Sequence, residues 1–275
     1  MFTQQQISKM VFFDIETSTT TQDAGSLSPA LQNQWHKRAE YLRDTLSQKY
    51  PDNKTLSDED LFTQKAALQA EFGRIVCISF GRIVYKDGEP TFIVAAISGE
   101  NEEELLLKAQ KSISKIFATG GVLVGHNIKR FDIPYLCKRL LINGLAIPDE
   151  LHFHNKKPWE IPMQDTMDVW SFGAWQEGFA SLDLICGVLD IPSPKGAMRG
   201  EEVPAAFWQG RLQEIATYNM EDVIGGHVWI GSIEIFGGTS YGDTFVGSEG
   251  DETFYGFDGN DTLTAGDGDD ILSGG

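Results

Sequence analysis

Short apolar runs in the first half of the chain are followed by stretches with helical periodicity. Runs rich in β-branched and aromatic residues predict strands at Lys9 to Ile15, Arg74 to Phe80, Thr91 to Ile97 and Val122 to Val124. Apolar residues at helical spacing predict helices over Asn101 to Phe117, over Ile133 to Ile142 and from about Leu212 onward. This order of elements predicts an α/β fold with a mixed sheet flanked by helices.

The connection between the first two predicted strands is unusually long and has two helical patterns of its own. Ser28 and Pro29 precede the first pattern, which has Trp35 on its apolar stripe. Ser57 with Asp60 starts the second. We therefore expect a helical-hairpin insertion over about 28–72, which either covers one edge of the sheet or clamps a substrate.

Composition and charge narrow the class of protein. The 275 residues suggest one domain of catalytic size and an appendage, and the hydrophobic content of 41% is enough for a large core. A net charge of −18 excludes a protein held to nucleic acid by bulk positive charge. No apolar run reaches the roughly 18 residues of a membrane helix, and residues 1–10 lack the pattern of a signal peptide. We expect a cytoplasmic protein with no membrane partner and three cysteines packed in the core.

The last 38 residues differ from the rest in composition. Residues 238–275 contain nine acidic residues and no lysine or arginine, which predicts a boundary between domains 1–237 and 238–275. The segment also repeats every nine residues, because Phe245, Phe254, Leu263 and Leu272 take the eighth place of successive units. A fixed period of this kind predicts stacked turns of similar structure.

Acidic residues occur in three motifs of the first domain. Asp14 and Glu16 are two apart at the end of the first predicted strand, so their side chains leave the same face. Asp132 follows a polar turn at the start of a predicted helix, where it is either an N-cap or a metal ligand. Tyr218 and Asp222 lie four apart on one face of the last predicted helix.

These motifs, in this order, resemble those of the DEDD superfamily of 3′-5′ exonucleases, in particular the predicted exonucleases related to the proofreading domain of family B DNA polymerases. The resemblance extends from Met10 to Asp222 and implies a ribonuclease H-like sheet. Members with a catalytic tyrosine place it four residues before the last aspartate. Because Tyr218 has this spacing from Asp222, the chain resembles the tyrosine subtype.

The resemblance implies a divalent-metal-dependent 3′-5′ exonuclease that releases nucleoside monophosphates from single-stranded DNA ends. Two Mg²⁺ or Mn²⁺ ions would activate the water and neutralise the leaving oxygen. By resemblance, Asp14 would bridge both ions, Glu16 and Asp222 would complete one, Asp132 would hold the other, and Tyr218 would orient the attacking water. Hard cations of this kind prefer carboxylate oxygens.

Substrate contacts are expected around the first and second motifs. Lys129 and Arg130 either bind the phosphate backbone or are solvated surface residues. Phe131 either stacks on a terminal base or packs in the core. Asp165 and Asp168 either support the site or cap loops. The full set of expected substrate contacts is Thr17, His126, Asn127, Lys129, Arg130 and Phe131.

The repeats of the second domain resemble RTX nonapeptide repeats. This resemblance implies a short parallel β-roll in which Asp258, Asp261, Asp267 and Asp270 bind Ca²⁺. Only the last two units fit well, because Tyr241 replaces a turn glycine in the first unit and Glu252 replaces an aspartate in the second. Such repeats are typical of secreted proteins, which conflicts with the cytoplasmic expectation and leaves the compartment open.

Two other functions remain open at this point. One is a 3′-5′ exoribonuclease on the same scaffold, because nothing in the sequence recognises or rejects the 2′-hydroxyl. The other is a non-catalytic calcium-dependent binding or structural module with an inactive nuclease-like domain. The presence of all five motif residues disfavours this last hypothesis.

Overall fold

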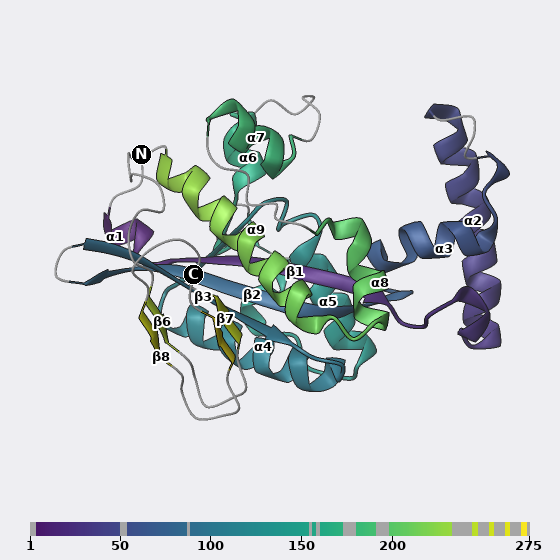
Figure 1. The fold of residues 1–275 in the computed structure, drawn as a ribbon, viewed down its shortest axis with the longest axis horizontal. Helices are drawn as coiled ribbons and strands as arrows, with labels where there is room; N and C mark the ends of the chain where they lie inside the picture. Colours follow the sequence, from purple (N-terminus) through teal and green to yellow (C-terminus); the bar gives the residue numbers. More distant parts are fainter. Residues whose placement is uncertain are drawn as a thin grey trace.

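The fold is given by a computed structural model, which describes residues 4–49, 54–86, 89–153, 156–157, 160–172, 180–190 and 198–232 and four short strands of the tail. Figure 1 shows the arrangement of these elements. The described helices are α1 (Gln4–Ile7), α2 (Pro29–Lys49), α3 (Asp58–Lys65), α4 (Glu102–Ala118), α5 (Asp132–Ile142), α6 (Thr166–Ser171), α7 (Leu182–Val188), α8 (Val203–Trp208) and α9 (Leu212–Ser232).

The central sheet combines antiparallel and parallel strands in the order β5-β4-β1-β2-β3, and two short strands of the tail extend it beyond β3. Strand β1 pairs antiparallel with β2 and parallel with β4, β2 pairs antiparallel with β3, and β4 pairs parallel with β5. The expected α/β fold, a ribonuclease H-like mixed sheet flanked by helices, is confirmed. The strands are β1 (Met10–Thr19), β2 (Gly73–Lys86), β3 (Glu89–Ser98), β4 (Val122–Gly125) and β5 (Met163–Asp165).

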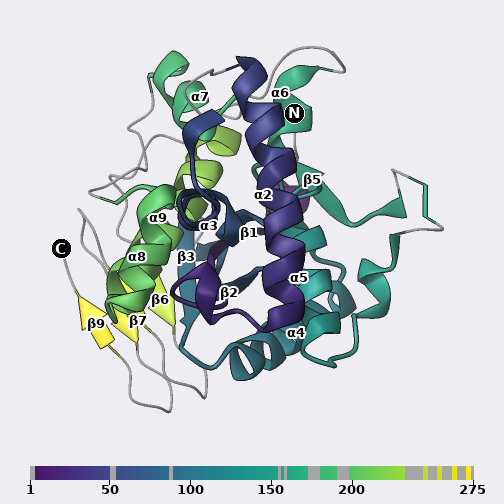
Figure 2. The same cartoon turned by 90° about the vertical axis from the view of Figure 1, so that its right-hand side faces the viewer.

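Strand β1 lies at the centre of the sheet and is buried on both faces. Figure 2 shows the sheet between a layer with α8 and α9 and a layer with α4 and α5. Phe12 packs in the first layer, edge-on to Phe92 with ring centroids 5.7 Å apart. Its neighbour Phe13 packs in the second layer, 5.3 Å from Phe80. Side chains on β1 can therefore reach bulk water only through a cavity.

Strand β1 is longer than the sequence pattern predicts. The expected end at Ile15 was wrong, because pairing with β2 continues to Thr19 after a bulge between Glu16 and Thr17. The polar residues beyond the bulge are buried and bonded to distant segments: Thr19 accepts a hydrogen bond from the Trp208 indole at 2.9 Å. Asp14 and Glu16 therefore lie inside a strand rather than at its end.

Helix α9 packs directly on strands β1, β2 and β3, with its backbone close to the sheet. The glycine pair at 225–226, which suggested a weakened helix, does not interrupt it, and α9 continues to Ser232. The loss of about 1 kcal/mol per glycine is outweighed here by packing on the sheet, where Gly225 is buried. Gly81 of β2 allows this close approach, because a β-carbon there would overlap Phe92 and Val223.

The expected helical insertion between β1 and β2 is present as α2 and α3. Ser57 and Asp60 form the predicted capping box at the start of α3. Trp35, 1% exposed, packs edge-on to Phe62 and Phe72, so the insertion has a small core of its own. Figure 1 shows both helices projecting beyond one end of the sheet. They do not cover an edge strand.

The tail contributes four three-residue strands nine residues apart. β6 pairs parallel with β8, and β7 pairs parallel with β9, so each strand bonds to the strand two repeats away. This is the parallel pairing expected for a β-roll. The four expected calcium ligands and the predicted boundary at 237/238 lie outside the described residues. The strands are β6 (Thr244–Val246), β7 (Thr253–Tyr255), β8 (Thr262–Thr264) and β9 (Ile271–Ser273).

Two smaller expectations concern cysteine and membranes. Cys77, Cys137 and Cys186 carry free thiols, and Cys77 and Cys186 are buried, as expected. Within the described part of the chain, no helix is both long and apolar enough to cross a membrane.

A buried ion pair joins α4 to α5 beneath the sheet. Arg139 donates to both oxygens of Glu102, at 2.8 and 2.5 Å, and both side chains are less than 10% exposed. The backbone N–H of Ile75 on β2 donates to Glu102 at 2.7 Å, and the Arg139 guanidinium also donates to the Ala70 carbonyl. The network connects β2, both helices and the end of the insertion.

We predict that Glu102→Gln destabilises the fold by about 3–5 kcal/mol, because it leaves the buried Arg139 charge unpaired. Chemical denaturation of the full chain measures the change. Glu103→Gln, an exposed neighbour on the same helix, makes the same change in charge and should leave stability within about 0.5 kcal/mol. Equal stability of the two variants would contradict the role given to the pair.

Candidate functional site

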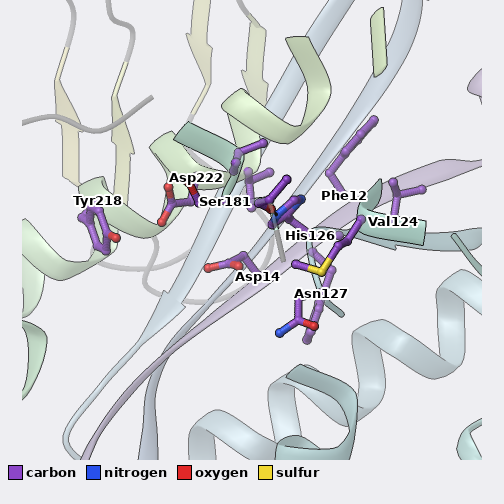
Figure 3. A pocket seen from close by; sticks show the side chains of 14 residues that line it. Phe12, Asp14, Val124, His126, Asn127, Ser181, Tyr218 and Asp222 are labelled. Atoms are coloured by element: carbon purple, nitrogen blue, oxygen red, sulfur yellow. Dashed lines mark hydrogen bonds between the residues drawn. The ribbon is translucent and has the colours of Figure 1, made fainter. Parts of the chain in front are cut away.

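Three carboxylates from two distant parts of the sequence lie close together above the centre of the sheet. Asp14 and Glu16 come from β1 and Asp222 from α9, and one oxygen of each lies within 4.8 Å of the others. Figure 3 shows the side chains of Asp14 and Asp222 pointing toward one another. Within the described residues, this is the only group of three or more acidic, histidine or cysteine side chains close enough to share a metal ion.

The group opens into a cavity of about 410 Å³ between β1, β4, α7 and α9. Asp14, Asp222 and Tyr218 form its acidic end, and His126 and Asn127 lie on the opposite side in Figure 3. The other lining residues are mainly apolar: Phe12, Phe13, Val124, Gly125, Met167, Ala180, Ser181, Leu182 and Val223. The cavity thus offers carboxylates at one end and an apolar wall beside them.

Asp132 lies next to this group without belonging to it. It is the first residue of α5, is 3% exposed, and accepts a hydrogen bond from the backbone N–H of Ile15 at 3.2 Å. The N-cap of α5 is Phe131, and no side-chain cap is present, so the alternative of Asp132 as an N-cap was wrong. Its carboxylate instead bonds to the backbone of β1 at Ile15, the residue between Asp14 and Glu16.

Burial and mutual repulsion disfavour ionisation of the group in the absence of cations. Burial raises the pKa of Asp14 well above its ordinary value, and the charges of Asp132, Glu16 and Asp222 raise it further. Burial also raises the pKa of Asp132 to about 7, with additions from Asp165 and Asp222.

Asn219 opposes this effect at Asp14. Its side-chain amide donates to an Asp14 oxygen at 2.6 Å, which favours the ionised carboxylate. The residue has no exposed surface. The sequence analysis did not single it out, although it lies between Ile215 and Val223 on the buried stripe of α9. A polar residue on such a stripe is a signal of a buried hydrogen bond.

Tyr218 donates its hydroxyl to the Asp222 carboxylate one turn further along α9. Burial raises the pKa of Tyr218, and the negative charge of Asp222 raises it further. The hydroxyl therefore stays protonated at neutral pH and acts as a donor, not as a general base.

These residues fit divalent cations of the hard type. Carboxylate oxygens are the donors that Mg²⁺ and Mn²⁺ prefer, and no sulfur or imidazole donor belongs to the group. A divalent cation would offset the neighbouring negative charges that raise the pKa of Asp14. Asp14, Glu16 and Asp222 have the donors for such an ion.

Hydrogen bonds to Asp165 hold the loop between β4 and α5 in place. The sequence leaves open whether Asp165 supports the site or caps a loop. The Asp165 carboxylate is fully buried and accepts from the backbone N–H groups of Asn127, Lys129 and Met167 at 2.9, 3.2 and 3.0 Å. Asn127 has a left-handed backbone, with φ of 64°. Three hydrogen bonds to one buried acceptor hold this uncommon conformation in place.

The expected substrate residues have different environments. His126 lines the cavity, but both ring nitrogens are engaged, with the Thr166 hydroxyl at 2.9 Å and the Ala180 carbonyl at 2.8 Å. Asn127 lines it with a buried side-chain oxygen that has no partner. Thr17 is buried, hydrogen-bonded to Tyr135, and does not line the cavity.

The remaining three expected contacts lie along the same loop. Phe131 is half-buried and packs against Tyr135, with ring centroids 5.5 Å apart. Lys129 and Arg130 each form an ion pair with Asp168, at 3.1 and 3.3 Å. The loop therefore carries two side chains of the cavity and two cations beside it.

Comparisons with known proteins match two parts of the chain to known families. A family model described as "predicted 3′-5′ exonuclease related to the exonuclease domain of PolB" matches residues 65–243. A model of the RTX calcium-binding nonapeptide repeat matches residues 237–275. A search of curated proteins found no significant match.

Among solved structures, the chain is similar to the family B DNA polymerase from the hyperthermophilic archaeon Pyrobaculum calidifontis. The sequence identity is 12% and the TM-score is 0.45. The match covers 78% of this chain and 23% of the polymerase, so the chain spans about a quarter of that protein's length.

We predict that Asp132→Asn stabilises the metal-free protein at pH 8 more than at pH 5. The raised folded-state pKa means that the carboxyl group stabilises the fold at low pH, and that this contribution is lost as the pH rises through about 7. Asparagine removes the charge and retains an acceptor for the Ile15 N–H. Melting temperatures in EDTA at both pH values measure the difference.

Asp44→Asn on the exposed face of α2 is the matched control, and its effect should be small at both pH values. A pH-independent effect of Asp132→Asn would mean that the carboxyl group ionises normally in the folded protein.

Proposed function

The chain belongs to the family of predicted 3′-5′ exonucleases related to the exonuclease domain of PolB, and we propose that it hydrolyses phosphodiester bonds at the 3′ ends of single-stranded DNA, releasing nucleoside monophosphates. The observation that carries this proposal is the meeting of Asp14, Glu16 and Asp222 beside a cavity that Tyr218 also lines. Residues more than 200 positions apart supply one acidic group, which supports a catalytic role over a role in folding.

We propose that Asp14, Glu16, Asp132 and Asp222 hold two Mg²⁺ or Mn²⁺ ions. When bound, such ions lower the pKa of the attacking water and neutralise the leaving oxygen. Asp14 has the central part, because the charges of the other three carboxylates all act on it. Asn219 keeps its carboxylate oriented and favours the ionised form that a cation requires.

Tyr218 would position the attacking water. Its hydroxyl proton is held by Asp222, which leaves the lone pairs of the hydroxyl oxygen to accept a hydrogen bond from water. Because its pKa is raised, the tyrosine orients the water without removing its proton. The proton passes to a carboxylate or to solvent.

The rest of the cavity would receive the terminal nucleoside. Phe12, Val124 and Leu182 offer an apolar wall for the sugar and base, which also excludes water from the reacting phosphate. The unpartnered side-chain oxygen of Asn127 can accept a hydrogen bond from a hydroxyl or an amino group of the substrate. Thr17 and Phe131 would act indirectly, by packing the elements that carry these residues.

A second proposed activity belongs to the tail. Its match to RTX repeats implies calcium binding, and the parallel strand pairs two repeats apart support a β-roll. We propose Asp258, Asp261, Asp267 and Asp270 as the ligands. The tail has nine acidic residues and no basic residue, so Ca²⁺ would offset a repulsion that opposes its folding.

We predict that the protein with Mg²⁺ shortens a 5′-labelled single-stranded DNA to a ladder and releases labelled mononucleotide first from a 3′-labelled strand. Asp14→Asn should lose this activity by at least about a thousandfold, because the central metal ligand is removed. Its melting temperature should not fall, since the neutral side chain relieves a buried charge. Asp44→Asn is the control, with activity unchanged.

The same assay separates the alternatives. A ladder from RNA but not from DNA would replace the proposal with an exoribonuclease. No cleavage of either polymer by a folded protein with Mg²⁺ or Mn²⁺ would contradict the nuclease proposal and favour a binding module. Release of label first from the 5′ end would contradict the direction of cleavage.

For the tail, we predict that titrating the full chain with Ca²⁺ increases β-structure in the circular dichroism spectrum, because the repeats fold as their charge is offset. Asp261→Ala with Asp270→Ala should reduce the change, while a matched pair of exposed changes, Asp44→Ala with Asp149→Ala, should not. An unchanged spectrum up to millimolar Ca²⁺ would end the β-roll proposal.

A further inference from the structure

Two cations beside the cavity share a single carboxylate. Lys129 Nζ lies 3.1 Å from Asp168 Oδ2, and Arg130 Nη2 lies 3.3 Å from Asp168 Oδ1. Each oxygen of the carboxylate thus faces one positive group. These two ion pairs thus place two cations on one carboxylate, in a protein whose total charge is −18.

This group lies at the rim of the cavity. Arg130 contacts the sulfur of Met167 at 3.8 Å, and Met167 and Asn127 both line the cavity. Asp168 directly follows Met167 in the chain, and Lys129 is two residues after Asn127. A polymer whose end lies at the carboxylates of β1 and α9 would pass this rim where it leaves the cavity.

The backbone beneath the group is rigid, although its side chains are partly exposed. Asp165 binds the backbone N–H groups of both Lys129 and Met167, so the two segments keep their spacing. The side chains of Lys129, Asp168 and Arg130 are 31%, 38% and 52% exposed. Ion pairs with this exposure contribute little to stability, so their partners exchange readily.

We propose that Lys129 and Arg130 form a binding subsite for a backbone phosphate, and that Asp168 is the resident anion that this phosphate displaces. The inference rests on the proposed function and adds a residue that weakens binding. A phosphodiester, like a carboxylate, presents two oxygens to an ammonium and a guanidinium group. The phosphate and Asp168 therefore compete for the same two cations.

The competition has a consequence for specificity. Asp168 is part of the chain and always near the two cations, so an anion that touches only this rim displaces it poorly. A strand whose 3′ end is also held in the cavity binds at two points and displaces it more effectively. Asp168 therefore favours polymers held by their ends over polymers that touch the rim alone.

The test is the affinity of a 5′-fluorescein-labelled oligothymidylate, measured by anisotropy at several salt concentrations. All proteins carry Asp14→Asn so that the strand is not hydrolysed. Adding Asp168→Asn should tighten binding about threefold to tenfold and steepen the salt dependence, because the phosphate no longer displaces an anion. Asp149→Asn makes the same change in net charge on an exposed site and should change affinity by less than about twofold.

A third protein tests the assignment of the cations. Lys129→Gln with Arg130→Gln, added to the Asp168→Asn protein, should remove the gain. Equal affinity of the Asp168→Asn and Asp149→Asn proteins overturns the proposal. Weaker binding by Asp168→Asn also overturns it, because Asp168 would then hold the cations in position for the phosphate.

Tripolyphosphate in metal-free buffer separates this inference from the nuclease proposal. Calorimetry should show tighter binding to the Asp168→Asn protein than to the Asp149→Asn protein. This result without any binding of the oligothymidylate supports the subsite and contradicts a nucleic-acid substrate. Binding of neither probe overturns both proposals.

Discussion

The site is built around acidic side chains that lie close together and partly buried between β1 and α9. Burial alone disfavours the ionised form of Asp14, and three neighbouring carboxylates disfavour it further. Such a group persists only because the surrounding fold is strong enough to hold it. The two large hydrophobic layers on either side of β1 supply that strength. The packing that stabilises the sheet therefore also keeps these carboxylates close enough together to bind a cation.

The polar groups around the site differ in burial and in the partners that they bind. Asp165 and Asp132 are buried and accept hydrogen bonds from backbone N–H groups, three at Asp165 and one at Asp132. Asp14 and Asn127 line the cavity. The partly exposed cations Lys129 and Arg130 both pair with the surface carboxylate of Asp168. Burial of the polar groups thus decreases from the centre of the sheet toward solvent.

Much of the fold follows from local pattern, and what does not follow depends on remote partners. Periodicity is enough for four of the five central strands, the two helices beneath the sheet and the capped helix that starts after Ser57, but not for the short strand β5. It is not enough for the second half of β1, because Thr19 is satisfied by the indole of Trp208, 189 residues away. The acidic motifs indicated the residues that meet at the centre. The pairing of Asp168 with two cations could not be predicted, since it depends on how two loops lie side by side.

The distance between the two sets of acidic residues has a simple origin in the backbone. Asp14 and Glu16 belong to the sheet, Asp222 belongs to α9, and the helix lies close to the sheet because position 81 has no side chain. The distance between the carboxylates of β1 and that of α9 therefore depends on how closely the helix approaches the sheet. A methyl group at position 81 would push these two layers apart and separate the carboxylates, although it would change none of them.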